Sequence, residues 1–420
     1  MTSSREFRYK PGLLAKNTAI NAVWQFVRIS AQLISLIVVA RGLGPDGYGT
    51  FAGVSGLAAI GGGLATLGSN YLLLQGVARV PDTFSRYWHA SLLTTMSGGI
   101  GLLTLFSLLA PLFLHVNIGV WPIMAIGASE LVCYPIVYLA GFAFQAHERL
   151  GWGAALPALM AASRAIGAIL YGAFDTNGGL SDYAWFHFGA SISALVCVLA
   201  ITTRKLSPTT VWKFFSLREL REGLSFSMPW FTTNALGELD KVLAVRLAGA
   251  EATGLYTAAY RLMSILTLPV ASLALAAQPR LFRLANESGN ATQRLVSQLS
   301  IAAILYSVAA MICLAVLAIT LPIFLGQSFM PSLQTARLLI IVLPLFAFRI
   351  LGSIVLLSAG HPIQRARIEA FGILVLYTLA TLLIRPGSLN GIVLAVCITE
   401  ATMDILLWVA IFKAFRRTAA

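Results

Sequence analysis

Long apolar runs, separated by short charged or turn-rich breaks, follow one another along nearly the whole chain of 420 residues. A transmembrane helix needs about 20 largely apolar residues, and these runs predict about twelve such spans. The predicted spans are 13–40, 50–77, 90–113, 119–142, 151–173, 183–203, 223–245, 254–278, 296–318, 335–357, 367–384 and 389–412. Because the breaks are short, the pattern predicts an all-α integral membrane protein with almost no soluble part.

An internal repeat divides these spans into two sets of six. When the sequence is shifted by 205 residues, Arg41 falls on Arg246, Gly44 on Gly249 and Gly49 on Gly254. Because six is an even number, both copies enter the membrane from the same side and are parallel repeats. We therefore predict two six-helix lobes, residues 1–205 and 206–420, joined by a linker at about 203–222 and enclosing a central cavity.

The segment Gly42-Leu43-Gly44-Pro45-Asp46-Gly47 matches the letters of a dinucleotide-binding loop, G-x-G-x-x-G. Such a loop needs a short strand before it and an acidic residue about 20 residues after it. Here a bilayer-length run precedes the glycines, Pro45 interrupts them, and the next acid after Asp46 is Asp82. The glycines are better explained by a tight turn between the first two spans.

Composition and charge agree with a membrane protein. The chain is 58% hydrophobic and 11% charged, against about 25% charged residues in soluble domains. Its net charge of +13 is unevenly placed, since loops on the side of both termini hold twenty Lys and Arg and loops on the other side hold four. This asymmetry places both termini in the cytoplasm, so the charge records topology and predicts no nucleic-acid partner. The four cysteines and five histidines show no grouping typical of a disulfide or metal site.

The segment VVARGLGPDGYGTFA after the first span resembles the signature of bacterial polysaccharide-biosynthesis flippases. These are the O-antigen translocase branch of the multidrug/oligosaccharidyl-lipid/polysaccharide (MOP) exporter superfamily. Weaker similarity continues in FQAHERLGWG, GQSFMPSLQTARLLI and LLSAGHPIQRAR, and so covers most of the chain. The resemblance implies twelve helices in two lobes in the bacterial inner membrane, and export of an oligosaccharide linked to polyprenyl diphosphate, as in lipopolysaccharide O-antigen synthesis.

Polar side chains recur every three or four residues along the first predicted span, which places them on one face of a helix. They are Asn17, Asn21, Gln25, Arg28, Gln32 and Ser35. A polar face through most of a span cannot face lipid, so it lines a wet cavity or packs against another helix. Since amides beside an arginine suit sugar hydroxyls and phosphate oxygens, we expect a substrate site at Asn21, Gln25, Arg28 and Gln32.

Ionisable residues inside the other spans are also candidates, because burying a charge in the bilayer costs about 2.5–3.5 kcal/mol or more. Arg164, Arg261 and Arg349 are suited to bind the diphosphate of a lipid carrier, because guanidinium groups match phosphate oxygens. The alternative for each is a structural ion pair, for example with Glu130, Glu400 or Asp404.

Under the shift of 205 residues, Thr233, Gly237 and Asp240 of the seventh span fall on Arg28, Gln32 and Ser35, so the matching face is acidic where that of the first span is basic. Glu238 and Lys241 are three residues apart and are expected to neutralise each other, which leaves Asp240 as an unpaired acid. We therefore consider Glu238 and Asp240 for a coupling ion, H⁺ or Na⁺. Structural pairing across helices is the alternative.

Taken together, the sequence predicts a transporter that moves a lipid-linked oligosaccharide from the cytoplasmic to the outer leaflet by alternating access. Catalytic residues, cofactors and metals are not expected. The main alternative is a multidrug or cation exporter of the same superfamily, which calls for an acidic, aromatic cavity. A polysaccharide polymerase or ligase usually needs a large outer loop with catalytic residues, and the outer loops here are short.

Overall fold

The computed structural model describes residues 11–116, 118–174, 179–209, 213–284 and 289–419, and every regular element in these ranges is helical. The first half contains α1 (Pro11–Ala65), α2 (Ser69–Arg79), η1 (Pro81–Thr83), α3 (Phe84–Leu114), α4 (Val120–Ala128), η2 (Ser129–Cys133), α5 (Tyr134–Ala146), α6 (Leu150–Ala173) and α7 (Gly179–Leu206). The second half contains α8 (Leu217–Ala248), α9 (Ala250–Leu284), α10 (Gly289–Leu325), η3 (Gln327–Phe329), α11 (Ser332–Ser358), α12 (Pro362–Leu383) and α13 (Leu389–Ala419). Residues 210–212 of the predicted linker lie outside the described ranges.

Ten stretches of the described residues are long and apolar enough to cross a membrane. The first, Ile20–Arg79, has 60 residues and covers most of the first predicted span and all of the second. The seventh predicted span is present as α8, whose polar residues keep it out of those ten. Each of the twelve predicted spans therefore corresponds to helix, which confirms the all-α membrane fold.

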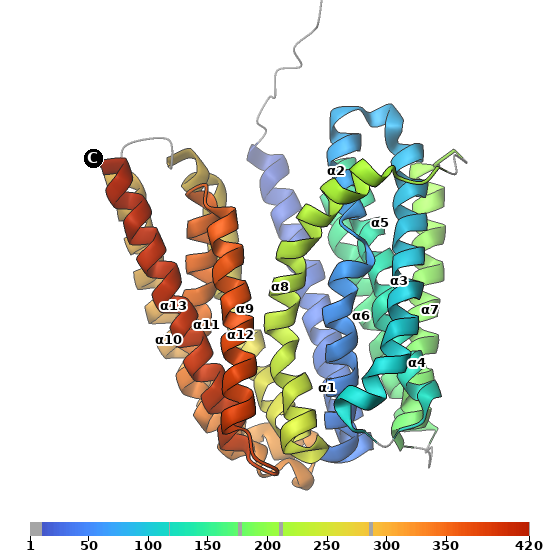
Figure 1. Ribbon diagram of the computed structural model, residues 1–420, viewed down its shortest axis with the longest axis vertical. Helices are drawn as coiled ribbons and strands as arrows, with labels where there is room; N and C mark the ends of the chain where they lie inside the picture. Colours follow the sequence, from blue (N-terminus) through green and yellow to red (C-terminus); the bar gives the residue numbers. More distant parts are fainter. Residues whose placement is uncertain (1–10, 117, 175–178, 210–212, 285–288, 420) are drawn as a thin grey trace, which may run out of the picture.

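The helices form two lobes that flank the middle of the molecule, and α1 begins at the same end at which α13 finishes (Figure 1). Helices α2 to α7 gather on one side and α10 to α13 on the other. In the middle, α1 packs against α6 of its own lobe and against α8 and α9 of the second. The lobe boundary at residues 205 and 206 stays a prediction.

The tight turn predicted from the glycine motif is present in both repeats. Within α1, Gly44 leaves the helical conformation with φ 67° and ψ 179° just before Pro45, and the matched Gly249 has φ 96° and ψ 167° between α8 and α9. Positive φ favours glycine, and the residue before a proline is pushed away from helical geometry. Each turn reverses the chain at the end of the molecule opposite the termini.

The two turns also bring the lobes into close contact at matched positions. A Cβ atom at Gly49 would lie 1.8 Å from the carbonyl oxygen of Ala250, and one at Gly254 would lie 1.9 Å from that of Pro45. Gly49 corresponds to Gly254 and Pro45 to Ala250 under the shift of 205 residues. The contact is therefore made twice around one approximate two-fold axis, and we call these four residues the glycine contact.

Arg41 and its repeat partner Arg246 both reach the opposite lobe at this end. Arg41 Nη2 donates to the carbonyl oxygen of Ile323 over 2.6 Å, at the end of α10. The Arg246 guanidinium lies 4.6 Å from the ring centre of Phe113, at the end of α3. Since α3 and α10 carry the third and the ninth predicted spans, these interactions repeat the symmetry of the glycine contact.

The outer helices present apolar side chains outward, as lipid contact requires. On α10 the exposed residues include Leu305, Val308, Ile312 and Ile319, whereas Ala303, Ala310, Leu314 and Ala318 are buried. A helix that is apolar on both sides suits a position between protein and hydrocarbon.

Candidate functional site

A central cavity lies between the lobes, lined by α1, η2, α5, α6, α7, α8 and α9. It has two adjoining chambers of about 260 Å³ and about 300 Å³, which share the lining residues Gln32, Ser55, Glu130, Tyr134, Arg164 and Arg261. Arg28 and Ser35 line the second chamber, and Glu238 lines the first. The fold thus brings together Arg28, Gln32, Arg164, Arg261 and Glu238 of the predicted site.

The polar face of α1 reaches this cavity only through its later members. Arg28, Gln32 and Ser35 line it, whereas Asn21 is exposed and Gln25 is half-buried, and neither is among the lining residues. The side chain of Asn17 lies outside the described residues. The polar face of α1 therefore lines the cavity over only part of its length.

Arg28 has no acidic partner within the described part of the chain. Its Nε atom is buried without a hydrogen-bond partner, while the side chain faces the second chamber. A buried donor that is left unpaired costs free energy, so the arrangement is favourable only if water or a ligand supplies an acceptor. Arg28 is accordingly the best-placed cation for an anionic ligand.

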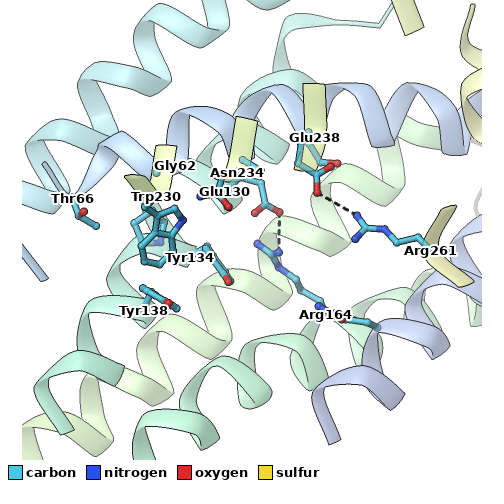
Figure 2. Close-up of a pocket in the computed structure, with 16 residues that line it drawn as sticks. Gly62, Thr66, Glu130, Tyr134, Tyr138, Arg164, Trp230, Asn234, Glu238 and Arg261 are labelled. Carbon is cyan, nitrogen blue, oxygen red and sulfur yellow. Dashed lines mark ion pairs between the residues drawn. The ribbon is translucent and has the colours of Figure 1, made fainter. Parts of the chain in front are cut away.

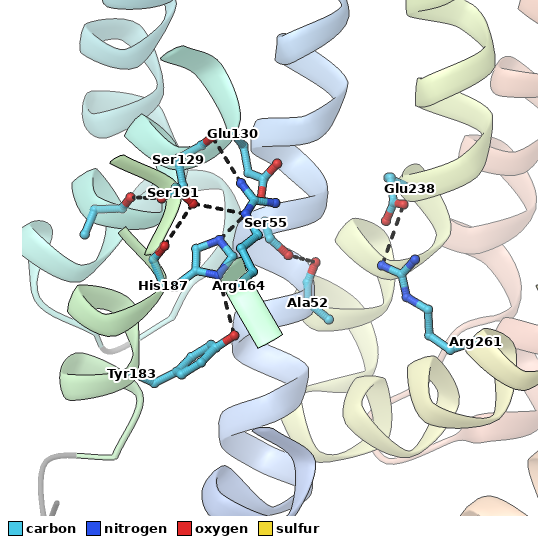
Figure 3. A network of polar contacts seen from close by, with 11 residues as sticks. Ala52, Ser55, Ser129, Glu130, Arg164, Tyr183, His187, Ser191, Glu238 and Arg261 are labelled. Carbon is cyan, nitrogen blue, oxygen red and sulfur yellow. Dashed lines mark hydrogen bonds and ion pairs between the residues drawn. The ribbon is translucent and has the colours of Figure 1, made fainter. Parts of the chain in front are cut away.

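Arg164 on α6 is held by protein groups on several sides (Figure 3). Its Nη1 lies 2.8 Å from Glu130 Oε1, its Nε donates to Ser191 Oγ over 3.0 Å, and its Nη2 donates to the Ser129 carbonyl over 3.2 Å. Ser129 and Glu130 belong to η2, a single π-helical turn of the kind often found at functional sites, in which the Ser129 carbonyl also accepts from the backbone N–H of Tyr134. Arg164 is thus fixed in position, and its charge is balanced by Glu130.

Arg261 and Glu238 lie opposite each other on α9 and α8 and face the first chamber (Figure 2). Arg261 Nη2 is 4.0 Å from Glu238 Oε1, and the Arg261 side chain is 46% exposed. An exposed pair at this distance is weak, typically about 0–1 kcal/mol. Arg261 also hydrogen-bonds the side chain of Tyr48, so a ligand would compete with a weak ion pair and one hydrogen bond.

The expectation that Asp240 is unpaired is wrong. Lys241 Nζ is 3.0 Å from Asp240 Oδ1 and 3.5 Å from Glu238 Oε2, so the predicted Glu238–Lys241 pair exists but is shared. The hydroxyl of Tyr256, on the next helix, also donates to Asp240. Asp240 is thus a buried, doubly satisfied acid on the side of α8 away from the central cavity, beside a space of only about 10 Å³.

Arg349 does not join the other three arginines. Its Nε donates to Glu400 Oε2 over 2.6 Å, linking α11 to α13, and its guanidinium lies 4.8 Å from the ring centre of Phe346. Arg349 is absent from the lining of both chambers. Arg349 thus forms the structural ion pair with Glu400 that the sequence analysis gave as the alternative to a diphosphate ligand.

Several lining residues were not identified from the sequence as candidates. Tyr134, Tyr138, Trp230 and Asn234 all border the first chamber. A signal was present, because Tyr134 and Tyr138 are four residues apart, as are Trp230, Asn234 and Glu238, and such spacing places each set on one helix face. No feature of the sequence showed that these two faces meet.

Comparison with known proteins identifies a sequence family that the chain matches and solved structures that have the same fold. Residues 14–285 match the sequence model of the family described as polysaccharide biosynthesis protein. No curated protein matches the chain.

Three solved structures share the fold over nearly the whole chain. The lipid II flippase MurJ in its inward closed conformation is 13% identical, with a TM-score of 0.71 over 96% of this chain and 90% of the other. The MATE multidrug transporter DinF-BH, solved as a complex, is 16% identical, with a TM-score of 0.68 over 98% of both chains. An inward-facing multidrug resistance MATE transporter of the MOP superfamily is 14% identical, with a TM-score of 0.67 over 95% of this chain and 98% of the other.

Proposed function

The chain belongs to the polysaccharide biosynthesis protein family, and from this premise we propose that it is a flippase for an oligosaccharide linked to polyprenyl diphosphate. The sugar and diphosphate occupy the central cavity while the polyprenyl tail stays in lipid. Alternating access of the two lobes then carries the head group from the cytoplasmic to the outer leaflet of the bacterial inner membrane, for surface polysaccharide such as O-antigen.

The charge of the central cavity carries this proposal. Its lining includes three arginines, Arg28, Arg164 and Arg261, and two acids, Glu130 and Glu238. Glu130 is taken by Arg164, the Arg261–Glu238 pair is loose, and Arg28 has no acid partner in the described ranges. An anionic diphosphate is therefore favoured over a cation, since guanidinium groups match phosphate oxygens and repel a positive ligand.

One observation favours the alternative, a multidrug or cation exporter. Tyr134, Tyr138 and Trp230 line the first chamber together with Glu130 and Glu238, and aromatic faces with acids are also suited to bind cations. The excess of arginine over acid in the whole cavity opposes this function.

Reconstitution distinguishes the two functions. In proteoliposomes we expect the protein to move a fluorescent polyprenyl-diphosphate-linked saccharide between leaflets and to leave a cationic dye unmoved. Transport of the dye without movement of the saccharide would establish the exporter instead.

For ion coupling, Glu238 is the better placed of the two acids that the sequence indicated, since Asp240 is buried, paired with Lys241 and hydrogen-bonded by Tyr256. Glu238 faces the cavity, where an H⁺ or Na⁺ can reach it. We expect Glu238→Gln to remove the dependence of flipping on an imposed H⁺ or Na⁺ gradient. An unchanged dependence would exclude Glu238 from coupling.

A further inference from the structure

Aromatic side chains from both lobes meet at one end of the central cavity. Tyr134 and Tyr138 come from α5 and have nearly parallel rings, with centres 6.1 Å apart. Trp230 comes from α8, and its ring centre lies 4.2 Å from that of Tyr138 at an interplanar angle of 79°. All three side chains are half-buried and line the first chamber, so part of each remains open to it. We call these three residues the aromatic corner.

Polar groups without protein partners surround the aromatic corner. Neither the Tyr134 nor the Tyr138 hydroxyl makes a hydrogen bond within the described residues, and the same is true of the Asn234 amide. Thr66 borders the same end, but its hydroxyl is held by protein, because it donates to Asn70 and accepts from the backbone N–H of Gly68. The corner thus combines apolar ring faces with unused donors and acceptors.

A hexopyranose ring has the complementary surface. Its C–H groups form an apolar face that packs on aromatic rings, and its hydroxyl groups lie around the rim, where they reach donors and acceptors beside those rings. Tyrosine and tryptophan present an apolar body and a polar tip, which is why they suit ligands with both characters. A flat hydrophobic cation would use the ring faces but would leave the amide and hydroxyl groups unpaired.

Within the first chamber, Trp230 and Tyr138 lie at one end and Arg261 at the other, with Arg164 between them and 5.8 Å from the ring centre of Tyr134 (Figure 2). Trp230, Asn234 and Glu238 follow one another at four-residue intervals on α8, so eight residues separate Trp230 from Glu238, or about 12 Å along the helix. Arg261 lies at the level of Glu238, 4.0 Å from it. A ligand that spans the chamber therefore meets aromatic rings at the Trp230 end, and guanidinium groups from the middle, at Arg164, to the other end, at Arg261.

We propose that the aromatic corner, with Asn234, is the saccharide subsite and that it binds the first sugars attached to the diphosphate. The inference rests on the proposed function, because it takes the arginine end as the diphosphate site. It assigns an orientation to the substrate, with the sugars directed toward the end of the molecule that holds the termini. It also gives the site a preference for lipid carriers that bear sugar.

The full-length protein in lipid nanodiscs tests this proposal with two probes, polyprenyl diphosphate alone and polyprenyl diphosphate bearing one N-acetylhexosamine. We expect the wild type to bind the sugar-bearing probe more tightly. Trp230→Ala should weaken binding of that probe about tenfold and change binding of the sugar-free probe by less than about twofold. Arg261→Ala, at the other end of the first chamber, should weaken binding of both probes. Trp121→Ala removes an exposed tryptophan elsewhere and should change binding of neither probe.

The thermal unfolding midpoint in the same nanodiscs shows whether Trp230→Ala is folded. If it is not, two milder variants keep the test valid. Trp230→Phe retains a ring and should retain most of the sugar preference. Tyr134→Phe removes only a hydroxyl and should weaken binding of the sugar-bearing probe by about threefold, without changing binding of the sugar-free probe.

The ways in which the proposal can fail are distinguishable. Equal binding of both probes by the wild type would overturn the saccharide subsite and leave the flippase in place. Equal weakening of both probes by a folded Trp230 variant would show that the aromatic corner only closes the lobes together. Binding of neither probe by a folded wild type would overturn the proposed function and the subsite with it.

Discussion

Arg28 and Arg349 illustrate how similar residues inside predicted spans acquire different environments. Arg28 faces the second chamber with a buried, unpaired Nε, whereas Arg349 is bound to Glu400 over 2.6 Å and lies outside the central cavity. The first arrangement is suited to binding a ligand, and the second stabilises the packing of α11 on α13.

Arg28→Ala should reduce surface polysaccharide export more than about tenfold while leaving the amount of folded protein unchanged, because it removes a cavity charge and breaks no ion pair. Arg28→Lys should support partial export, since it keeps the charge and loses the bidentate geometry. Export and protein abundance are measured in the same cells. Asn21→Ala is the matched control, because Asn21 lies on the same helix outside the cavity lining, and it should export normally. Normal export by abundant Arg28→Ala would remove Arg28 from the site.

Arg349→Ala should instead lower the amount of folded protein, because it leaves Glu400 buried without its partner, at a cost of about 3–5 kcal/mol. The double variant Arg349→Ala with Glu400→Gln should recover much of that loss, as expected when two residues interact directly. The measurement is the amount of monodisperse protein recovered after solubilisation in detergent. If Arg349→Ala accumulates normally and fails only in export, Arg349 acts on the substrate and the structural interpretation is wrong.

At the scale of helices, the glycine contact joins the turn within α1 to the start of α9 at the end opposite the termini. It depends on the absence of a side chain, because backbone from the other lobe occupies the place of a Cβ atom at both glycines. Alternating access requires this contact to form and to separate. Its strength should therefore affect which end of the cavity is open.

Gly49→Ala or Gly254→Ala should force the lobes apart at this end, since a Cβ atom would lie 1.8 Å or 1.9 Å from a carbonyl oxygen. In a cysteine-free background, Ser55→Cys in the cavity should then react at least several times faster with an impermeant thiol reagent added outside intact cells. Gly101→Ala on α3, where no atom lies within 4 Å, is the control and should leave labelling unchanged. Unchanged labelling in both contact variants would show that this contact does not limit access.

At the scale of the whole molecule, the positive-inside asymmetry predicts that the end that holds the termini faces the cytoplasm. The saccharide subsite and the linker between the lobes lie toward that same end. The direction of transport in the proposed function depends on this orientation.

Orientation can be measured with two single cysteines in the same cysteine-free background. Thr209→Cys in the linker should be protected from an impermeant thiol reagent in intact cells and become labelled after the membrane is permeabilised. Ser181→Cys, at the exposed start of α7, should be labelled without permeabilisation. The opposite pattern would invert the topology and reverse the proposed direction of transport.

The sequence by itself determined the membrane fold, the twelve spans and the turns at Gly44 and Gly249. These features depend on apolar length, charge asymmetry and the local conformational freedom of glycine, all of which can be read along the chain. The shift of 205 residues also matched Gly49 with Gly254, although it did not show that the turns touch each other.

Only the tertiary structure decided which polar groups meet. Helical spacing shows that Arg28 and Gln32 share a face, but it carries no information about which distant helix that face contacts. Glu130 and Arg164 are joined across 34 residues by way of a π-helical turn, and Asp240 is paired by Lys241 and by Tyr256 of the next helix. The aromatic corner needs side chains from both lobes. Because helix packing alone selects these partners, the sequence could name Arg28, Arg164, Arg261 and Arg349 together, and the fold separated the last from the rest.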